Sequence, residues 1–332
     1  MNANTVDDGL RVALDGALDG LAPRSAAAAV GRLIAQYRGQ TPTGAPVLRD
    51  RADVVAYAAY RMPATSAAAR AALGALASAL PGDWAPDSHL DLGGGTGAAI
   101  WAANDTWGAA RPVTVLDWAE PALALGRELA AAHPHLTSAD WRRARLGGTA
   151  PLPAAGLVTL SYVLGELTER DRDAAVTAAA GAGQAVVVVE PGTPDGYERV
   201  LAAREGLIRA GMRVAAPCPH GADCPIAPGT DWCHFSVRVS RSALHRQVKG
   251  GSLPYEDEKF SFVAAVRPPL APTPAPARVL RRPQIRKGHV LLDLCTEDGT
   301  LTRTTVTKRQ GPAYRAARDA SWGDAWEPPE TT

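Results

Sequence analysis

The feature that most constrains the fold is an alternation of short apolar runs and helical stretches between about residues 88 and 200. The apolar runs are SHLDLGGG, PVTVLDW, LVTLSYVLGEL and QAVVVVEPG, and the stretches between them include AAIWAANDTW and EPALALGRELAAAH. Strands that alternate with helices predict parallel βαβ units with right-handed crossovers. The run from Ala185 to Glu190 is typical of a central strand covered on both faces. The predicted fold class is α/β with a Rossmann-like sheet.

A glycine-rich turn follows the first of these runs and precedes a helix. Its residues are Asp91, Gly93, Gly94, Gly95 and Gly97. Glycines let the backbone turn sharply and approach a ligand closely. Asp117 ends the next apolar run, where a carboxylate can accept both hydroxyls of a ribose. These features fit a dinucleotide or S-adenosylmethionine, and the alternative is a tight turn whose glycines serve packing alone.

The pattern DLGGGTG resembles the first motif of class I methyltransferases. That resemblance implies that the loop lies against the methionine part of S-adenosylmethionine and that Asp117 binds the ribose. It also implies that Asp140 and Trp141 lie against the adenine. The stretch after the fourth strand reads SYVLGEL, which lacks the Asn/Asp-Pro-Pro-aromatic motif of amine methylation, and no general base is apparent. An active rRNA methyltransferase and a fold that binds the cofactor without chemistry therefore both remain open.

Four cysteines form the second candidate site. They are Cys218, Cys224, Cys233 and Cys295, separated by five, eight and 61 residues. Four thiolates suit either Zn²⁺ or an iron–sulfur cluster, and the irregular spacing separates the two only partly. The alternative is four unrelated cysteines. His220 and His234 lie in the same polar segment as candidate ligands, donors to the ligands or RNA contacts, the last two being favoured.

Long segments around these cysteines resemble the mitochondrial small-ribosomal-subunit methyltransferase-like family and its bacterial relatives. They include APCPHGADCPIAPGTDWCHFSVRVSRSALHRQVKGG, LPYEDEKFSFVAAVR and HVLLDLCTEDG. The resemblance implies a methyltransferase fold that associates with the small ribosomal subunit during its assembly. It further implies a [4Fe–4S] cluster held by Cys218, Cys224, Cys233 and Cys295, while leaving catalytic activity open. A zinc-stabilised RNA-binding module is the remaining alternative.

The charge distribution suggests where RNA would bind. The formal net charge is only +1, but residues 278–309 carry eight basic and three acidic side chains, a local excess of +5. Basic side chains near phosphates release counterions and give salt-dependent affinity. The candidate RNA contacts are Arg238, Arg241, Arg246, Lys249, Arg281, Arg282, Arg286 and Lys287. The alternative for the first four is a solvated basic face.

These features divide the 332 residues into five expected parts. They are an N-terminal helical region (1–85), a Rossmann-like S-adenosylmethionine-binding domain (86–210), a Cys/His loop with the rest of the sheet (211–267), a Pro-rich linker (268–277) and a basic β-rich segment (278–326). Within the first part, helix breaks are expected at Pro23, around Pro42 to Pro46 and at Pro63.

The start of the chain and its hydropathy suggest a location. Asp7 and Asp8 stand where a secretory signal would need basic and then apolar residues, and no run of about 18 apolar residues occurs. We therefore expect a cytoplasmic protein with no membrane partner. We also expect it to be monomeric away from the ribosome.

Overall fold

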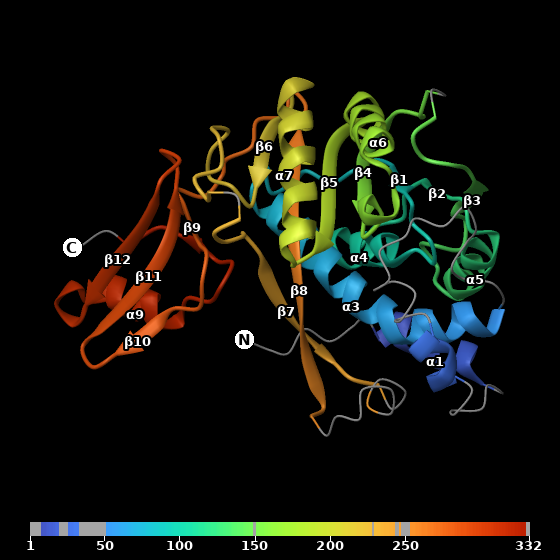
Figure 1. Cartoon of the computed structure of the whole chain (residues 1–332), viewed down its shortest axis with the longest axis horizontal. Helices are drawn as coiled ribbons and strands as arrows, with labels where there is room; N and C mark the ends of the chain where they lie inside the picture. Colours follow the sequence, from blue (N-terminus) through green and yellow to red (C-terminus); the bar gives the residue numbers. More distant parts are fainter. Residues whose placement is uncertain are drawn as a thin grey trace.

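The structure is a computed structural model that describes residues 8–19, 26–32, 51–148, 151–227, 229–242, 246 and 253–329. Figure 1 shows a large α/β unit with helices from the N-terminal region along one side and a small β unit, formed by the C-terminal residues, on the other. The segment after β6, which carries three cysteines, runs between the two units.

The large unit is built on one eight-stranded sheet. The strand order is β3-β2-β1-β4-β5-β8-β6, and β7 pairs with the outer part of β8. The strands are β1 (His89–Leu92), β2 (Val113–Asp117), β3 (Asp140–Arg143), β4 (Ala155–Ser161), β5 (Gly183–Pro191), β6 (Arg213–Ala216), β7 (Phe235–Ser240) and β8 (Tyr255–Val266). β1 to β5 are parallel, and β8 runs antiparallel between β5 and β6. This topology confirms the predicted α/β Rossmann-like sheet.

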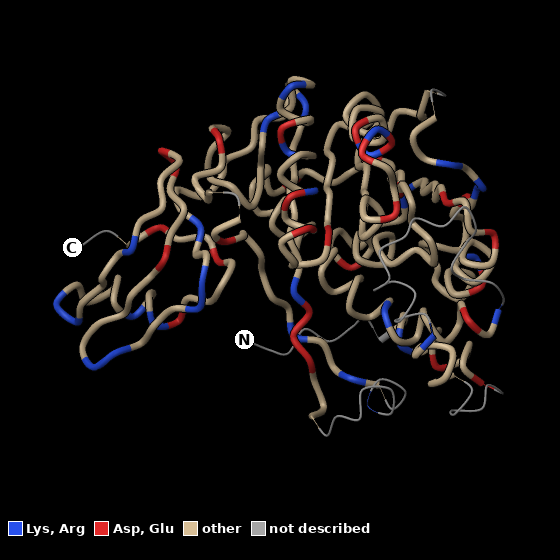
Figure 2. The backbone as a smooth tube through the Cα atoms, viewed as in Figure 1, with Lys and Arg blue, Asp and Glu red and all other residues tan. Residues whose placement is uncertain are grey.

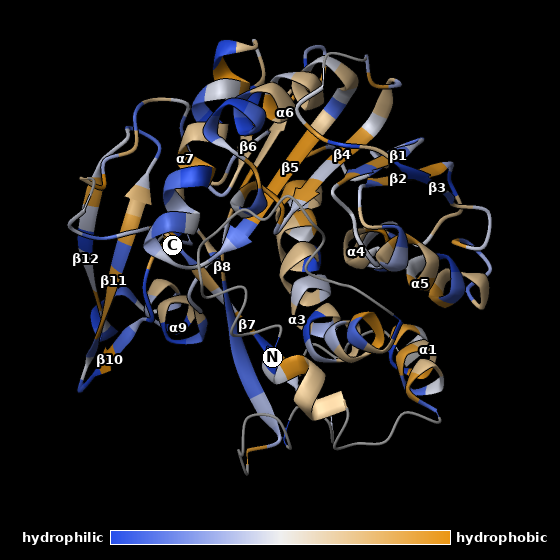
Figure 3. Cartoon of the chain, turned by 45° about the vertical axis from the view of Figure 1, so that its right-hand side comes forward, coloured by the Kyte–Doolittle hydropathy of each residue, from blue (hydrophilic) through white to orange (hydrophobic). Residues whose placement is uncertain are grey.

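Helices cover both faces of this sheet. One face packs against α3 (Arg51–Ser78), α4 (Ala98–Trp107) and α5 (Glu120–Ala131), and the other against α6 (Glu169–Ala182) and α7 (Pro194–Arg209). Residues 185–189 of β5 alternate between these two cores and are fully buried, as predicted for a central strand. Figure 3 shows β4 and β5 as apolar strands between helices with more polar outer faces.

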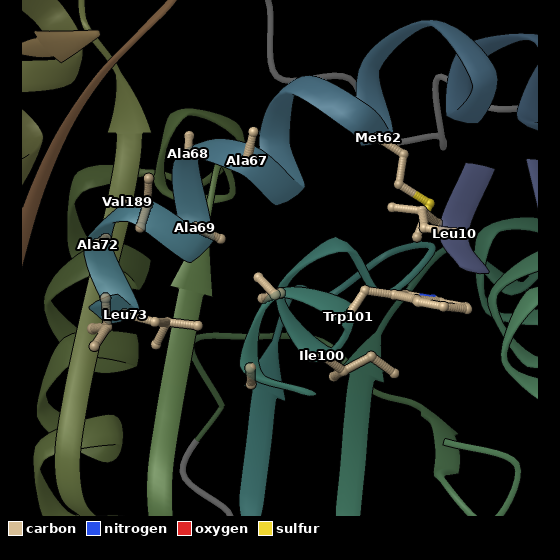
Figure 4. Close-up of a cluster of buried hydrophobic side chains, with 14 of the residues drawn as sticks. Leu10, Met62, Ala67, Ala68, Ala69, Ala72, Leu73, Ile100, Trp101 and Val189 are labelled. Carbon is tan, nitrogen blue, oxygen red and sulfur yellow. The ribbon is translucent and has the colours of Figure 1, made fainter. Parts of the chain in front are cut away.

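The N-terminal region contributes α1 (Asp8–Leu18), a helical stretch over 26–32 and α3. The predicted break at Pro63 is wrong, because α3 continues through it. Small residues after Pro63 bring the helix close to the sheet, and Figure 4 shows Ala67, Ala68, Ala69 and Ala72 of α3 in the same buried cluster as Val189 of β5. This burial offsets the cost of a proline inside a helix. Pro23 and Pro42 to Pro46 lie outside the described residues.

The C-terminal unit is a five-stranded sheet with one helix and its own core. Its elements are β9 (Ala277–Val279), β10 (Gln284–Arg286), β11 (His289–Thr296), β12 (Leu301–Thr307), β13 (Ala325–Trp326) and α9 (Pro312–Asp319). β11 is central and pairs with β9, β10 and β12. The predicted turn at Asp298 and Gly299 joins β11 to β12, and Gly299 adopts a φ of 78° that suits glycine.

In the part of the chain that the structure describes, no helix combines the length and apolar character needed to cross a membrane.

Candidate functional site

The glycine turn joins β1 to α4 at the carboxyl edge of the sheet. Gly93, Gly95 and Gly97 have φ values of 67°, 53° and 88°, a region that other residues rarely adopt. Side chains would also collide here, since a Cβ on Gly93 would meet Val163 and one on Gly94 would meet Asp91. At Gly95 the nearest atom to such a Cβ is Asp117 Oδ2, at 3.8 Å. The turn is therefore packed against the protein at Gly93 and Gly94 and more open at Gly95.

Two carboxylates lie at this turn, and one of them bonds it. Asp117, at the end of β2, accepts hydrogen bonds from the backbone N–H groups of Gly95 (2.9 Å) and Ala119 (2.8 Å). A carboxylate has about four acceptor sites, so Asp117 keeps capacity for further donors. Asp91 lies fully buried behind the turn, where the Thr159 hydroxyl donates to its Oδ1 at 2.7 Å. Burial raises the pKa of Asp91 to about 7.

The two residues expected near an adenine occupy different environments. Asp140, at the start of β3, is exposed and accepts a 2.6 Å hydrogen bond from Arg142. Trp141 is only 8% exposed. Its ring fills the space over Gly97 and Gly126, so it closes the packing between the turn and α5. A contact of either residue with an adenine stays a prediction.

Further polar groups that the sequence did not single out line the same edge after β4 and β5. Tyr162 has a φ of 59°, which is strained for an aromatic residue. Its hydroxyl bonds Glu258 of β8 at 3.1 Å, and Arg61 of α3 donates to both oxygens of Glu258 at 3.0 and 3.1 Å. The link joins segments almost 200 residues apart, and the sequence showed only a tyrosine after an apolar run.

Two glutamates lie near this edge of the sheet, Glu166 after β4 and Glu190 in β5. Glu190, at the end of β5, accepts hydrogen bonds from the Leu164 N–H (3.0 Å) and from Arg199 (2.7 Å). Glu166 is exposed on the turn after β4, where the charges of Asp117 and Glu190 raise its pKa. The carboxyl edge of the sheet therefore gathers several acids whose ionisation burial opposes.

The four cysteines line one cavity of about 40 Å³ between the two units. Cys218 and Cys224 come from the segment after β6, Cys233 precedes β7, and Cys295 lies in β11 of the C-terminal unit. The Tyr197 hydroxyl of α7 lies 3.1 Å from Cys224 Sγ. Burial raises the pKa of the Cys233 thiol, and the charges of the other three cysteines raise it further. The structure thus brings together four residues that the sequence spreads over 78 positions.

Sulfur and imidazole atoms meet in this cavity, although not as a closed ligand set. His220 Nε2 lies 3.4 Å from Cys295 Sγ. His234 stands outside the cavity and stacks on Trp232, with ring centroids 5.0 Å apart. Within the described ranges, no three His, Cys, Asp or Glu side chains converge closely enough to hold a metal ion. An iron–sulfur or zinc centre therefore remains a prediction.

Several predicted RNA contacts are paired with carboxylates. Arg238 bonds Asp257 (2.9 Å), Arg241 bonds Glu256 (3.4 Å), and Arg281 bonds Asp231, two residues before Cys233. These three arginines hold the strand pair β7–β8 and the join between the two units. Arg246 donates to the Arg241 carbonyl at 2.9 Å, and Lys249 lies outside the described residues.

The exposed basic residues of the C-terminal unit gather at its far end. We define the basic tip as Arg286, Lys287, Lys308 and Arg309, all of them exposed. The Lys308 N–H donates to the Gly288 carbonyl at 2.9 Å, which joins the β10–β11 turn to the end of β12. Figure 2 shows positive charge on these loops at the end of the unit farthest from the large sheet. Arg282 is exposed nearby in the chain, before β10.

The comparison with family models decides the family. The model described as mitochondrial small ribosomal subunit Rsm22 matches residues 51–327, which is most of the chain. The chain belongs to this family. The match includes the glycine turn, all four cysteines and the basic tip, and it confirms the resemblance seen in the sequence.

Two curated relatives of the Rsm22 family extend this result. The human ribosome assembly protein METTL17, mitochondrial, is 29% identical over 266 residues, covering 72% of this chain and 55% of that protein. The Rsm22-cox11 tandem protein 2, mitochondrial, of Schizosaccharomyces pombe is 28% identical over 185 residues, covering 43% of this chain and 24% of that protein. The chain thus spans about half the human protein and about a quarter of the yeast protein.

A solved structure with a similar fold is the magnesium protoporphyrin IX methyltransferase of Synechocystis PCC 6803. It has a TM-score of 0.40 and 13% identity, with 63% of this chain and 84% of that chain covered. The assignment of the Rossmann-like fold rests on the strand order described above.

The comparisons correct the expected location. Both curated relatives are named as mitochondrial proteins, which points to the mitochondrion and contradicts the cytoplasmic location expected from the first residues. Two aspartates near the start and the lack of a long apolar run exclude only certain secretory and membrane signals, so they were a weak basis for that expectation.

Proposed function

We propose that this protein is an assembly factor of the small ribosomal subunit that binds rRNA, carries S-adenosylmethionine at the glycine turn and holds a structural [4Fe–4S] cluster. The observation that carries the proposal is the single cavity lined by all four cysteines of the chain. The names of the relatives, one a ribosome assembly protein, supply the ribosomal partner. The five-part division of the chain given above is part of the proposal.

The donor chemistry of the cavity fits such a cluster. Cys218, Cys224, Cys233 and Cys295 would hold it, and four thiolates are the usual ligand set. When bound, the cluster would supply a rigid anionic centre that fastens Cys295 of the C-terminal unit to the other three thiols. Since four thiolates leave no iron open, we assign it a structural role and no radical chemistry.

The carboxyl edge of the sheet fits S-adenosylmethionine. Among the described residues, a Cβ at Gly95 would meet only Asp117 Oδ2, at 3.8 Å, and the remaining acceptor sites of Asp117 can bind ribose hydroxyls. Asp91, Gly93, Gly94 and Gly97 shape the turn, as in the resemblance to class I methyltransferases. Asp140 at the rim can bind a polar group of the adenosine, and Trp141 supports the turn from the core.

The basic tip, together with Arg282, is the proposed centre of the rRNA contact. Its four side chains are exposed, and none of them forms an ion pair with a carboxylate in the part of the chain that the structure describes. Arg238, Arg241 and Arg281 are partly neutralised by their partners and contribute less. The residues that line the cysteine cavity join the C-terminal unit to the large unit. This contact sets the direction in which the basic tip faces the ribosome.

The test is a Cys233→Ser variant compared with wild-type protein purified without oxygen. Loss of the visible iron–sulfur absorbance together with weaker binding to small-subunit rRNA supports the proposal, and unchanged RNA affinity in cluster-free protein refutes the structural role. Colourless wild-type protein that contains zinc indicates the zinc-stabilised module. Transfer of labelled methyl groups from S-adenosylmethionine to purified rRNA indicates an active methyltransferase.

The matched test of the RNA surface is the pair Lys287→Ala and Lys308→Ala. Each phosphate contact that is lost should reduce the slope of log affinity against log salt by about 1, so the double variant should lose about 2. Arg238→Ala is the control, because Arg238 already bonds Asp257, and we expect little change in its slope. Equal losses in the control and the double variant would argue against the basic tip.

A further inference from the structure

Two arginines enter the cysteine cavity without carboxylate partners. Arg204 of α7 is only 3% exposed, and Arg278 of β9 is half-buried. Both line the cavity. Neither forms an ion pair with a carboxylate among the residues that the structure describes, although the charge of Asp324 acts on Arg278. A buried charge without a partner costs free energy. An anion bound in the cavity would therefore stabilise these two guanidinium groups.

Their hydrogen bonds hold the ligand-bearing segments. Nη2 of Arg204 donates to the carbonyls of His220 (3.0 Å) and Ala222 (2.6 Å), between Cys218 and Cys224. Its Nε atom is buried with no partner in the described part. One nitrogen of the guanidinium group therefore bonds both loop carbonyls, and its other N–H donors stay available to a ligand in the cavity.

Arg278 reaches the cavity from the opposite unit. Its Nε donates to the Pro217 carbonyl at 2.9 Å, next to Cys218, and its Nη1 donates to the Gly323 carbonyl at 3.1 Å. Arg278 is also the ladder partner of Cys295, since β9 and β11 are antiparallel. The Cβ atoms of directly opposed residues in such a ladder lie about 5 Å apart, and the side chains of Arg278 and Cys295 line the same cavity.

Both guanidinium side chains line the cavity together with all four cysteines. Their charges therefore lie beside thiols from both units.

We propose that Arg204 and Arg278 are the counter-charges of an anionic four-thiolate centre in this cavity, an inference that rests on the proposed function. Four thiolates carry four negative charges, and a divalent core, whether zinc or an oxidised cubane, neutralises two of them. The two guanidinium groups match the remaining two. They would keep such a centre neutral as a whole between the two units.

The experiment compares Arg204→Met, Arg278→Met and Arg204→Lys in the full chain, loaded and after removal of the metal by chelation. Arg209→Met is the control, because Arg209 lies exposed on the same helix. The measurements are the thermal midpoint of each form, the rate of metal release to a chelator and, for an iron–sulfur protein, the reduction potential. We expect both Met variants to release metal at least about tenfold faster, a change that corresponds to about 1.4 kcal/mol.

The signature of a counter-charge is a difference between the two forms. Each Met variant should lower the midpoint of loaded protein more than that of metal-free protein, and shift the potential to more negative values. Arg204→Lys should restore most of the potential. Equal losses in both forms, or an unchanged potential, would show that the arginines only hold the loop and overturn this inference while the centre stands. Wild-type protein that retains neither iron nor zinc would overturn the proposed function as well.

Discussion

The glycine turn and the cysteine cavity differ in how the chain builds them. Residues 91 to 141 supply the turn, its two carboxylates and Trp141, all from neighbouring parallel strands of one sheet. The cavity needs α7, the segment after β6, the start of β7, and strands β9 and β11 of the second unit. The turn therefore depends on local sequence, whereas the cavity depends on two units docking correctly.

The largest expected effect comes from a variant that disrupts the cysteine cavity and leaves the glycine turn intact. Cys295→Ser removes the thiol from β11, so we expect complete loss of stably bound iron or zinc, while affinity for S-adenosylmethionine stays within about twofold. Metal analysis and calorimetric titration with the cofactor measure the two sites separately. Thr296→Ser, one residue along the same strand, is the control and should keep its metal. Parallel loss of both sites would show that they fold as one.

The reverse experiment breaks the turn alone. Gly94→Ala would push a methyl group into Asp91 and within 2.7 Å of Val115, so either the turn or β2 must move. We expect at least about a tenfold loss of S-adenosylmethionine affinity, equivalent to about 1.4 kcal/mol, with metal content unchanged. Gly74→Ala in α3 is the control, because an added Cβ there has open space and favours the helix. Normal cofactor binding by Gly94→Ala would separate the turn from the cofactor.

A third prediction uses pH to examine the turn. Burial raises the pKa of Asp91 to about 7, above its usual value of 3.8, so the folded state favours the protonated acid. The stabilisation from this group is complete below about pH 4 and is lost as pH rises towards 7. Asp91→Asn should remove that loss. As the pH rises from about 4 to 7, the free energy of unfolding of the variant should fall less than that of wild type, and the difference should exceed about 1 kcal/mol. Parallel pH curves from denaturant titrations would contradict the assignment.

The smallest effect concerns α7, which serves both regions through Arg199 at the sheet edge and Arg204 in the cavity. Thr193 caps this helix, and its hydroxyl accepts a hydrogen bond from the Gly196 N–H at 3.1 Å. Thr193→Ala should lower the free energy of unfolding by about 1 kcal/mol, as measured by denaturant titration, and Thr193→Ser should restore it. An effect confined to metal binding would show that α7 is anchored mainly from the cavity side.

How far the sequence could predict each region follows from this difference. The strands, the glycine turn and the β11–β12 turn have local signals, so their predicted places agree with the structure. The helix break at Pro63 failed because the tertiary burial of α3 outweighs the local cost of proline. Arg204 had a signal that was overlooked, since it shares the buried face of α7 with Val200 and Leu207. The pairing of Arg278 with Cys295 in the β9–β11 ladder had no signal in the sequence, because the register between distant strands is set by the folded sheet.

The position of β8 has a consequence for how the chain folds as it is made. β8 is the last strand of the large sheet in the chain, yet it lies inside that sheet, between β5 and β6. Until residues 255–266 leave the ribosome that synthesises them, β5 has an open edge and β6 has no neighbour to pair with. Because domains fold as units during synthesis, a nascent chain that stops before this strand should expose apolar strands to chaperones or aggregation. Cys295 emerges later still, so a centre held by all four cysteines can be completed only after this residue has left the ribosome.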